Sequence, residues 1–546
     1  MHTRHLIPLA AYAMAIVLAL FGTLWFGSFS AGFNEPDEPS HFLNALFVRD
    51  YFRDGFGTHP MRFATEYYLH YPKLAIGHWP PAYYGLVGFL FFIVPASAKT
   101  ALILNAIVST SPVIVIAAVI NRFFGATTAL LASLWYISLP AVIWSLQYFL
   151  LDQAVAAAVL AACAAWLWFA FRPTLPRALS VAVLCSFAVL TKGNGWLVAL
   201  FPLCHIALTG RWNLLKDKRT YLCLILALLL VVPWYILTVG IAADGFNYQP
   251  GFAYAELALV SNLRFIVLNL GYAGMILATV GVSASWNNRT SKPERWECAA
   301  ACLALVFATL IFQSIVPASL EERYIAPALP ALLIPAVMGI SACLAWIGRF
   351  RAQLLRVAAT AVLILAAIYP ALLSVSESHA KGNLRLDLAA ERIVSDRRPE
   401  IWIIDGSSAA EGALAAEIAI RDPDRQIYVV RSSQLLAVSD FMGRKYRLKF
   451  SDPAAVLQQV QALGAQGIVL SNQSDQPEFD HSKQLRAALG LAQSGYRQSL
   501  AAEHRNVPGK TELYEATEPR TPDLGRLREI NFPAKAQALG AVPRSP

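Results

Sequence analysis

The sequence predicts a mostly α-helical fold, in which a polytopic bundle of transmembrane helices is followed by a C-terminal soluble α/β domain. The 546 residues are 57% hydrophobic and only 14% charged, whereas an average soluble domain has roughly a quarter charged residues. The apolar residues form runs of about 18 or more, which is enough to cross a bilayer. From Ser376 on the composition becomes polar, and short apolar runs alternate with helical patterns.

The first apolar run covers residues 6–28 and follows His2, Arg4 and His5. A secretory signal has an apolar core of about 7–15 residues, so this longer run is predicted to be an uncleaved first span with the N-terminus inside. The alternative is a signal cleaved near Ser28–Ala31. Ten further runs bring the prediction to about eleven spans. They cover residues 100–121, 126–144, 152–171, 178–192, 195–209, 221–240, 263–284, 297–316, 325–347 and 357–375.

The charges between these runs predict the orientation of the spans. The net charge is +9, and the residues before Ser376 carry +8 of it. Short basic loops on the inner face of a membrane explain this excess, so no nucleic-acid surface is implied. Basic residues do collect in alternate loops: Arg122; Arg172 and Arg177; Arg211, Lys216, Lys218 and Arg219; Arg289, Lys292 and Arg295; Arg349, Arg351 and Arg356. The other loops, together with everything after Ser376, are then predicted to lie outside.

Residues 29–99 are predicted to form one long outer loop within a transmembrane module of residues 1–375. The apolar stretch Tyr83–Val94 is too short to span comfortably, so it is predicted to be an interfacial or re-entrant helix. Loops of this length inside a compact domain are usually functional. We therefore expect the loop to contribute residues to a site.

Residues 376–518 are predicted to form the extracytoplasmic α/β domain. Short apolar runs at 401–404, 426–430 and 467–470 predict buried strands, and helical patterns lie at 409–420 and 453–463. This alternation favours a parallel sheet. Asp405–Ser408 follows the first strand without a glycine fingerprint, so it is interpreted as a structural turn. Residues 519–546 are polar and rich in proline, which predicts a poorly ordered tail.

An acidic segment follows the first span. Glu35, Asp37, Glu38 and His41 lie within eight residues of each other. Carboxylates this close together, partly shielded from water, have raised pKa values, which suits a general base or a metal site. The alternative is a solvated loop in which Glu35 or Asp37 caps a helix that starts near Pro39.

Three more charged residues lie at predicted outer ends of spans. A carboxylate there, such as Asp152, is costly unless it is paired or hydrated. Lys192 and Arg323 are basic on the outer face, against the usual bias, and an anionic ligand such as phosphate would explain them. The alternatives are a helix cap for Asp152, snorkelling for Lys192 and pairing of Arg323 with Glu321 or Glu322. Together with His78 and the carboxylates of the acidic segment, including Asp37, these residues could converge on one outer cavity.

The ordered set of motifs resembles the GT-C superfamily of membrane glycosyltransferases, in particular the branch of protein O-mannosyltransferases and lipid A aminoarabinose transferases. The resemblance covers about residues 1–375, and His41 departs from it because a tyrosine is common at that position. The motifs are Asp37-Glu38, Gly77-His78-Trp79-Pro80-Pro81-Ala82-Tyr83-Tyr84, Leu151-Asp152, Thr191-Lys192-Gly193 and Arg323-Tyr324-Ile325-Ala326-Pro327-Ala328-Leu329-Pro330.

The resemblance implies an inverting hexosyl- or pentosyltransferase that uses a polyprenyl-phosphate-linked sugar and a glycan, lipid or protein acceptor. It implies that Asp37 is the general base on the acceptor hydroxyl, with Glu38 and Asp152 positioning the base or the acceptor. Lys192 and Arg323 would neutralise the donor phosphate. His78, Lys73, Tyr324 and His41 complete the expected substrate-binding set. No cofactor is certain: a divalent cation is left open, and its expected ligands are Asp37, Glu38 and Asp152.

Two other functions remain open at this stage. A transporter or lipid-linked-sugar flippase would also place polar residues in an inner cavity, although repeated halves with broken helices are not evident in the sequence. A non-catalytic membrane protein whose α/β domain binds a partner would tolerate replacement of Asp37. The charged residues lie at span ends on one predicted face, which favours an enzyme. The expected location is a bacterial inner membrane, in contact with its lipids, with the active site and the C-terminal domain outside.

Overall fold

The computed structural model describes residues 3–349, 353–377, 379–396, 398–440 and 442–532. The chain divides into two compact units whose segments alternate along the sequence. The first consists of Met1–Phe26, Gly77–Tyr83 and Leu102–His379, and the second of Gly27–Ile76, Tyr84–Ala101 and Ala380–Pro546. The sequence placed the whole outer loop with the transmembrane module, but most of that loop packs with the C-terminal residues.

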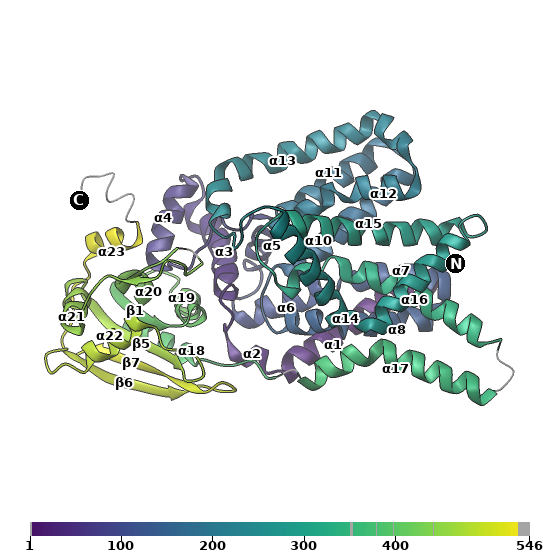
Figure 1. Cartoon of the computed structure of the whole chain (residues 1–546). Helices are drawn as coiled ribbons and strands as arrows, with labels where there is room; N and C mark the ends of the chain where they lie inside the picture. Colours follow the sequence, from purple (N-terminus) through teal and green to yellow (C-terminus); the bar gives the residue numbers. More distant parts are fainter. Residues whose placement is uncertain (1–2, 350–352, 378, 397, 441, 533–546) are drawn as a thin grey trace. The chain divides into compact units, whose positions relative to one another are not determined.

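The first unit is built from helices (Figure 1). A helix occurs at each of the eleven predicted positions, though several predicted spans are divided or bent. The helices are α1 (Thr3–Trp25), α6 (Ala98–Thr110), α7 (Pro112–Phe124), α8 (Ala126–Ile137), α9 (Pro140–Leu146), α10 (Asp152–Phe171), α11 (Leu175–Val189), α12 (Phe201–Thr209), α13 (Lys218–Ala243), α14 (Phe252–Asn287), α15 (Pro293–Ile315), α16 (Ala328–Ile347) and α17 (Gln353–Glu377).

Seven stretches within the described residues are long and apolar enough to cross a membrane, with α6 and α7 counted as one. The pair α8–α9, which is bent by 66°, would make an eighth. The predicted number of eleven is therefore not confirmed, because α11, α12 and the apolar part of α17 are shorter than a full span. The chain is nevertheless a multi-pass membrane protein, since so many long apolar helices cannot be covered by the rest of the chain.

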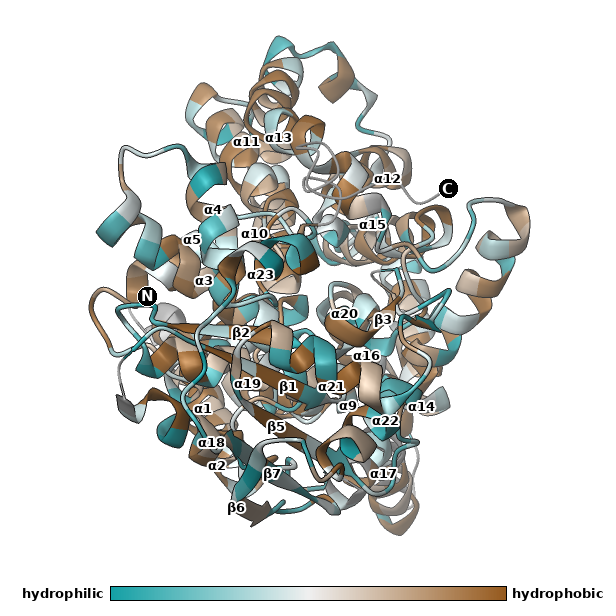
Figure 2. Cartoon of the chain, turned by 90° about the vertical axis from the view of Figure 1, so that its left-hand side faces the viewer, coloured by the Kyte–Doolittle hydropathy of each residue, from teal (hydrophilic) through white to brown (hydrophobic). Residues whose placement is uncertain are grey.

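Helix α13 illustrates how the first unit meets lipid. Its large apolar side chains are exposed, including Leu229 at 65% and Leu237 at 79%, and hydrophobic residues dominate the helix (Figure 2). Helices α14 and α16 instead pack backbone to backbone. A Cβ atom on Gly281 would lie 2.0 Å from the carbonyl oxygen of Pro335, and one on Gly339 would lie 1.9 Å from that of Leu277. Small residues at a helix crossing are typical of membrane bundles, where close packing replaces the hydrophobic effect.

The second unit combines helices with a five-stranded sheet (Figure 1). Its helices are α2 (Ser28–Ala31), α3 (Glu38–Asp50), α4 (Pro60–His70), α5 (Ala82–Leu90), α18 (Leu386–Ile393), α19 (Ser408–Arg421), α20 (Ser432–Leu436), α21 (Pro453–Ala462), α22 (Asp480–Leu489) and α23 (Leu524–Asn531). Its strands are β1 (Glu400–Gly406), β2 (Ile427–Arg431), β3 (Ala437–Val438), β4 (Arg447–Leu448), β5 (Ala465–Gln473), β6 (Tyr496–Glu503) and β7 (Gly509–Ala516). At nine residues, α5 is too short to span, as predicted for this stretch.

The sheet order is β2-β1-β5-β7-β6. The three predicted strands are β1, β2 and β5, and they pair in parallel as expected. The sequence missed β6 and β7, which add an antiparallel edge. Strand β6 is mostly exposed, so it lacks the apolar run that marks a buried strand. Figure 2 shows the contrast between the hydrophobic β1 and β5 and the more hydrophilic β6.

The predicted poorly ordered tail contains a helix. Asp523 caps α23 by accepting a hydrogen bond from the backbone N–H of Arg526 at 2.9 Å, and Leu527 is fully buried in the core of the α/β domain. The expectation is therefore wrong for residues 524–531, because a side-chain cap and one buried leucine fix the helix despite its polar composition. Residues 533–546 of the predicted tail lie outside the described residues.

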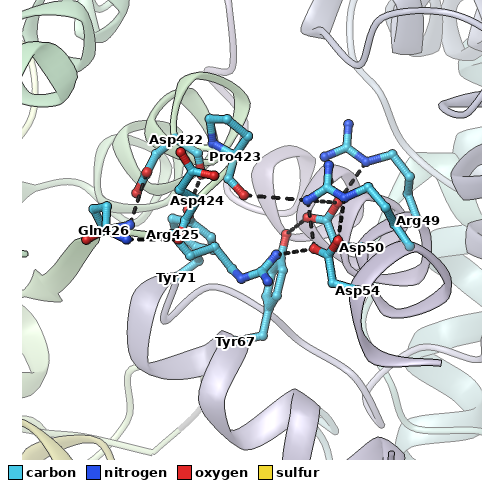
Figure 3. A network of polar contacts seen from close by, with 11 residues as sticks. Arg49, Asp50, Asp54, Tyr67, Tyr71, Asp422, Pro423, Asp424, Arg425 and Gln426 are labelled. Carbon is cyan, nitrogen blue, oxygen red and sulfur yellow. Dashed lines mark hydrogen bonds and ion pairs between the residues drawn. The ribbon is translucent and has the colours of Figure 1, made fainter. Parts of the chain in front are cut away.

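Polar contacts join the outer loop to the α/β domain within the second unit (Figure 3). Asp54 accepts hydrogen bonds from Arg53 at 2.8 Å and from Arg425 at 2.9 Å. These two guanidinium groups lower the pKa of the Asp54 carboxyl to about 2. Tyr71 donates to the backbone carbonyl of Asp422 at 3.3 Å. Contacts between residues some 370 positions apart explain why the loop and the C-terminal residues form one unit.

We expect the second unit to lose stability between about pH 6.5 and pH 4 because of His70. Its ring stacks on Tyr428 with centroids 4.0 Å apart, and Nδ1 lies 3.0 Å from the carbonyl oxygen of Ile427. Burial lowers the pKa of His70 from 6.5 to about 4. Between these two pH values the imidazole is protonated in the unfolded chain and neutral in the folded chain. The free energy of unfolding should fall by about 3 kcal/mol over this window and then level off.

The measurement is denaturation of the detergent-solubilised protein at a series of pH values, with His70→Phe as the matched variant. That variant should show a fall that is smaller by about 3 kcal/mol over this window, because His504, whose pKa burial also lowers, contributes equally to both proteins. An equal fall in both proteins would show that His70 is not responsible.

Candidate active site

Three charged side chains meet in the first unit. Lys192 Nζ donates to Asp152 Oδ1 at 2.6 Å, and Arg323 Nε lies 3.8 Å from Asp152 Oδ2. All three are buried, with Asp152 only 1% exposed. The two carboxylate oxygens are thus divided between two cations that lie 40 and 171 positions further along the chain. We call Asp152, Lys192 and Arg323 the ion cluster.

Short local structures hold each member of the ion cluster in place. Asp152 begins α10. Lys192 precedes a 3₁₀ helix and is held by a turn in which the N–H of Gly195 donates to its carbonyl at 2.8 Å. Arg323 belongs to the short 3₁₀ helix Glu322–Ile325 that precedes α16. All three therefore lie at the ends of apolar helices, as the sequence predicted.

Aromatic and acidic side chains surround the ion cluster. Lys192 Nζ lies 4.8 Å from the centre of the Tyr324 ring, a cation–π contact that favours a cation in an apolar setting. Arg323 also pairs with Glu321, with 2.5 Å between Nε and Oε2. The predicted alternative of an Arg323–Glu321 pair is thus present together with the Asp152 contact. The group as a whole contains two cations and two carboxylates.

His78 also lies in the first unit. Its motif is tied to the Lys192 segment, because the N–H of Ala82 donates to the carbonyl of Leu190 at 2.8 Å. Burial lowers the pKa of His78 below its usual value, and Asp244 opposes that shift. A largely neutral imidazole near a phosphate would act as a hydrogen-bond donor rather than as a fixed charge.

The sequence left open whether Glu35 or Asp37 caps the helix that follows them, and the structure answers this question. The Glu35 carboxylate accepts from the backbone N–H groups of Asp37 at 2.7 Å and Glu38 at 3.1 Å, so it is Glu35 that holds the start of α3. Asp37 occupies the cap position of this described helix, but its side chain makes no cap hydrogen bond. The capping interpretation is therefore correct for Glu35 and not for Asp37.

Glu38 forms a buried ion pair that the sequence did not reveal. Lys381 Nζ donates to both of its carboxylate oxygens, at 2.7 and 2.9 Å. Neither side chain is more than 1% exposed. The backbone N–H of Asn34 donates to the same carboxylate at 3.1 Å. Glu38 thereby fixes the segment on which Asp37 lies, which agrees with a positioning role.

His41 is buried and its Nδ1 lies 2.7 Å from the hydroxyl oxygen of Tyr84. Tyr84 is the last residue of the motif Gly77–Tyr84, so this hydrogen bond joins Tyr84 to α3, the helix that begins at Glu38 of the Asp37-Glu38 motif. The histidine that departs from the family pattern therefore has a tyrosine as its partner. This contact gives His41 a structural task, and its expected contact with substrate stays a prediction.

Lys73 lies in the second unit, close to the loop that carries Asp37. Its Nζ donates to Ser408 Oγ at 2.8 Å and to the carbonyl of Pro36 at 3.4 Å. Burial lowers the pKa of Lys73 to about 8, and nearby Arg431 adds to the shift. With this pKa the charged form of Lys73 still predominates at neutral pH, and its expected contact with substrate stays a prediction.

The sequence predicted that Asp37 joins Asp152, Lys192 and Arg323. The structure brings the last three together, whereas Asp37, Glu38, His41 and Lys73 belong to the second unit. The meeting of the two sets stays a prediction. Among the described residues, no group of three or more His, Cys, Asp or Glu side chains could hold a metal ion, and the need for a divalent cation also stays a prediction.

Buried ion clusters also occur for purely structural reasons, since they favour one packing arrangement over others. The ion cluster would then only tie α10 to the segments before α12 and α16. Its composition nevertheless suits an anion: an ammonium and a planar guanidinium, held close together by one carboxylate, match the geometry of a phosphate group.

Comparisons with known proteins give a match at the level of fold. No family model matches the sequence, and no curated protein matches it. Crystal structures of ArnT from Cupriavidus metallidurans match in the apo state, with 15% identity and a TM-score of 0.54 over 94% of this chain and 99% of that one. The ArnT structure bound to undecaprenyl phosphate matches with 14% identity and a TM-score of 0.52, over 92% of this chain and 97% of that one.

These matches show that the chain has the fold of ArnT, which agrees with the fold that the resemblance implies. They also extend the predicted resemblance. The sequence motifs end before residue 375, but a match over 94% of the chain includes the C-terminal α/β domain.

Proposed function

We propose that this chain, which has the fold of ArnT, is a membrane glycosyltransferase that moves a sugar from a polyprenyl-phosphate donor to a hydroxyl acceptor. The ion cluster is the observation that carries the proposal. A polyprenyl phosphate leaves with its negative charge developing on the phosphate, and fixed cations in a site shielded from water stabilise such a charge. One of the matching ArnT structures contains undecaprenyl phosphate, which supports a donor of this class.

In this proposal, Lys192 and Arg323 bind the phosphate of the donor, and Asp152 holds both cations in position. Arg323 can offer two parallel N–H donors, whereas Lys192 offers a single point charge. Tyr324 limits the movement of the Lys192 ammonium through its ring. His78 donates a further hydrogen bond to the phosphate or to the sugar.

Asp37 is proposed as the general base that takes the proton from the acceptor hydroxyl. Glu35 satisfies the backbone at the start of α3, so the Asp37 carboxylate is not needed as a helix cap. The attack would come from the face of the sugar opposite to the departing phosphate, so the anomeric configuration would invert. We propose that the reaction occurs on the outer face of a bacterial inner membrane and that the acceptor is a glycan, a lipid or a protein.

The test is a donor screen with the purified protein in lipid nanodiscs. Polyprenyl phosphates carrying different hexoses and pentoses are supplied with a simple hydroxyl acceptor, and the release of free polyprenyl phosphate is measured with and without a metal chelator. We expect release from at least one donor. Translocation of a donor across the membrane of sealed proteoliposomes without any release would instead support the alternative of a lipid-linked-sugar flippase.

A further inference from the structure

The second unit contains a cavity of about 310 Å³ that lies apart from all the residues assigned above. Three segments and one helix face line it: Phe29–Phe33, Ser97–Lys99, Asn383–Asp387, and the side of α19 that carries Glu417 and Arg421. Its volume is at the lower end of the range for small-molecule sites. The lining mixes aromatic, basic and acidic side chains, which makes it unlike a gap between packed apolar residues.

Hydrogen bonds and close packing hold the walls of this cavity in place. Asn383 Nδ2 donates to the carbonyl of Ser30 at 2.6 Å, and the side-chain oxygen of Asn383 accepts from the N–H of Arg385 at 2.7 Å. Gly32 has a φ of +67°, and a Cβ atom there would lie 3.2 Å from Glu417 Oε1. A glycine thus lets the backbone turn directly over the buried carboxylate of α19.

Some of the described charged side chains in the cavity lining have an ion-pair partner and others do not. Among the described residues, the side chains of Lys99 and Arg385 take part in no ion pair, and Lys99 Nζ lies 5.9 Å from the centre of the Phe29 ring. Glu417 is buried and paired with Arg421. Asp387 Oδ1 is buried, yet it has no hydrogen-bond partner in the described structure. A buried acceptor without a donor is costly, so a ligand that supplies a hydroxyl or amine donor would be favoured here.

The chain also places this cavity at the level of a membrane surface. Phe29 is four residues beyond Trp25, where the first candidate span ends, and the candidate span Ala98–Phe124 begins within another lining segment. Residues so close to the ends of two spans must lie near the lipid headgroups.

We propose that this cavity binds the headgroup of an anionic membrane lipid whose phosphodiester carries free hydroxyl groups, as in phosphatidylglycerol. Lys99 and Arg385 face the phosphate, and the carboxylates of Asp387 and Glu417 accept hydrogen bonds from the hydroxyls. A bound lipid would fasten the lining of this cavity to the bilayer. The inference stands apart from the proposed transfer reaction, because no residue of that reaction lines this cavity.

The experiment measures lipid binding to the delipidated full chain in detergent by titration calorimetry. Short-chain phosphatidylglycerol is compared with short-chain phosphatidylcholine, which has a phosphate but no hydroxyl groups, and with soluble glycerol 1-phosphate. We expect phosphatidylglycerol to bind more tightly than both. The double variant Lys99→Gln/Arg385→Gln should weaken its binding by about tenfold or more, because two charge-assisted contacts are lost.

Asp387→Asn gives a second test, since it should reduce the preference for phosphatidylglycerol over phosphatidylcholine while the phosphate contacts persist. Lys483→Gln, at an exposed ion pair elsewhere in the same unit, is the matched control and should bind as the wild type does. Circular dichroism checks that each variant is folded. Equal binding of phosphatidylcholine, or unchanged binding by the double variant, would overturn the proposal. Equally tight binding of glycerol 1-phosphate would overturn the membrane lipid as the source of the ligand.

Discussion

Replacing Asp37 with Asn should reduce sugar transfer by about a hundred- to ten-thousandfold, which is the usual contribution of a general base. The amide keeps the shape of the side chain and cannot accept the proton of the acceptor hydroxyl. The protein should still fold and enter the membrane, because Glu35 and not Asp37 holds the first turn of α3. The measurement is the rate of polyprenyl phosphate release by the purified variant with the donor found in the screen.

Asp424→Asn is the matched control, because Asp424 is an exposed carboxylate of the same unit (Figure 3). It should transfer sugar at the wild-type rate. A loss confined to Asp37→Asn would support its role as the base, and undiminished transfer by that variant would refute the assignment.

Lys192→Met should affect both stability and activity. The substitution leaves the Asp152 carboxylate buried, with Arg323 at 3.8 Å as its remaining cation of the ion cluster. Breaking a buried ion pair costs about 3–5 kcal/mol, and we expect the lower end because Arg323 remains. Transfer should fall by about a hundred- to a thousandfold, since a donor aimed at the leaving charge is lost.

Denaturation in detergent and donor kinetics measure these two effects separately. The double variant Asp152→Leu/Lys192→Met removes both buried charges, so it should regain most of the lost stability. It should remain inactive, because neither the ammonium nor its carboxylate is restored. A double variant that regained activity along with stability would show that the ion cluster has only a structural role.

Much of the membrane unit could be predicted from the sequence because long apolar runs most often form transmembrane helices. The run at residues 152–171 has the same bounds as α10, and the run at 297–316 ends within one residue of the end of α15, which starts four residues earlier. The predicted spans that are not confirmed include the short helices α11 and α12, and the predicted span at residues 126–144 is bent by 66° where Pro140 starts α9. Bends of this kind depend on neighbouring helices, which a local pattern does not contain.

In the α/β domain, the buried strands could be predicted from the sequence and the exposed strand could not. The strands β1, β2 and β5 are buried and therefore apolar in sequence, so they were found, whereas the exposed β6 was not. The packing of the outer loop with this domain depends on contacts such as Asp54–Arg425. A local sequence pattern cannot predict a contact between residues some 370 positions apart.

For the candidate site, the useful signal was a charge at the end of an apolar run. It identified Asp152, Lys192 and Arg323, which the structure brings together. Lys381 was missed because it lies in a polar segment, where one more lysine is unremarkable, although in the fold it is fully buried against Glu38.

The central claim is that the ion cluster and Asp37 serve a single polyprenyl phosphate, and photo-crosslinking tests it most directly. A polyprenyl phosphate with a photoreactive group beside the phosphate is irradiated with the protein in nanodiscs, and the labelled peptides are identified by mass spectrometry. We expect labels in the peptides that carry Asp37, Lys192 and Arg323, displaced by excess undecaprenyl phosphate and lost in Lys192→Met. Labels spread over unrelated helices, or unchanged by Lys192→Met, would contradict it.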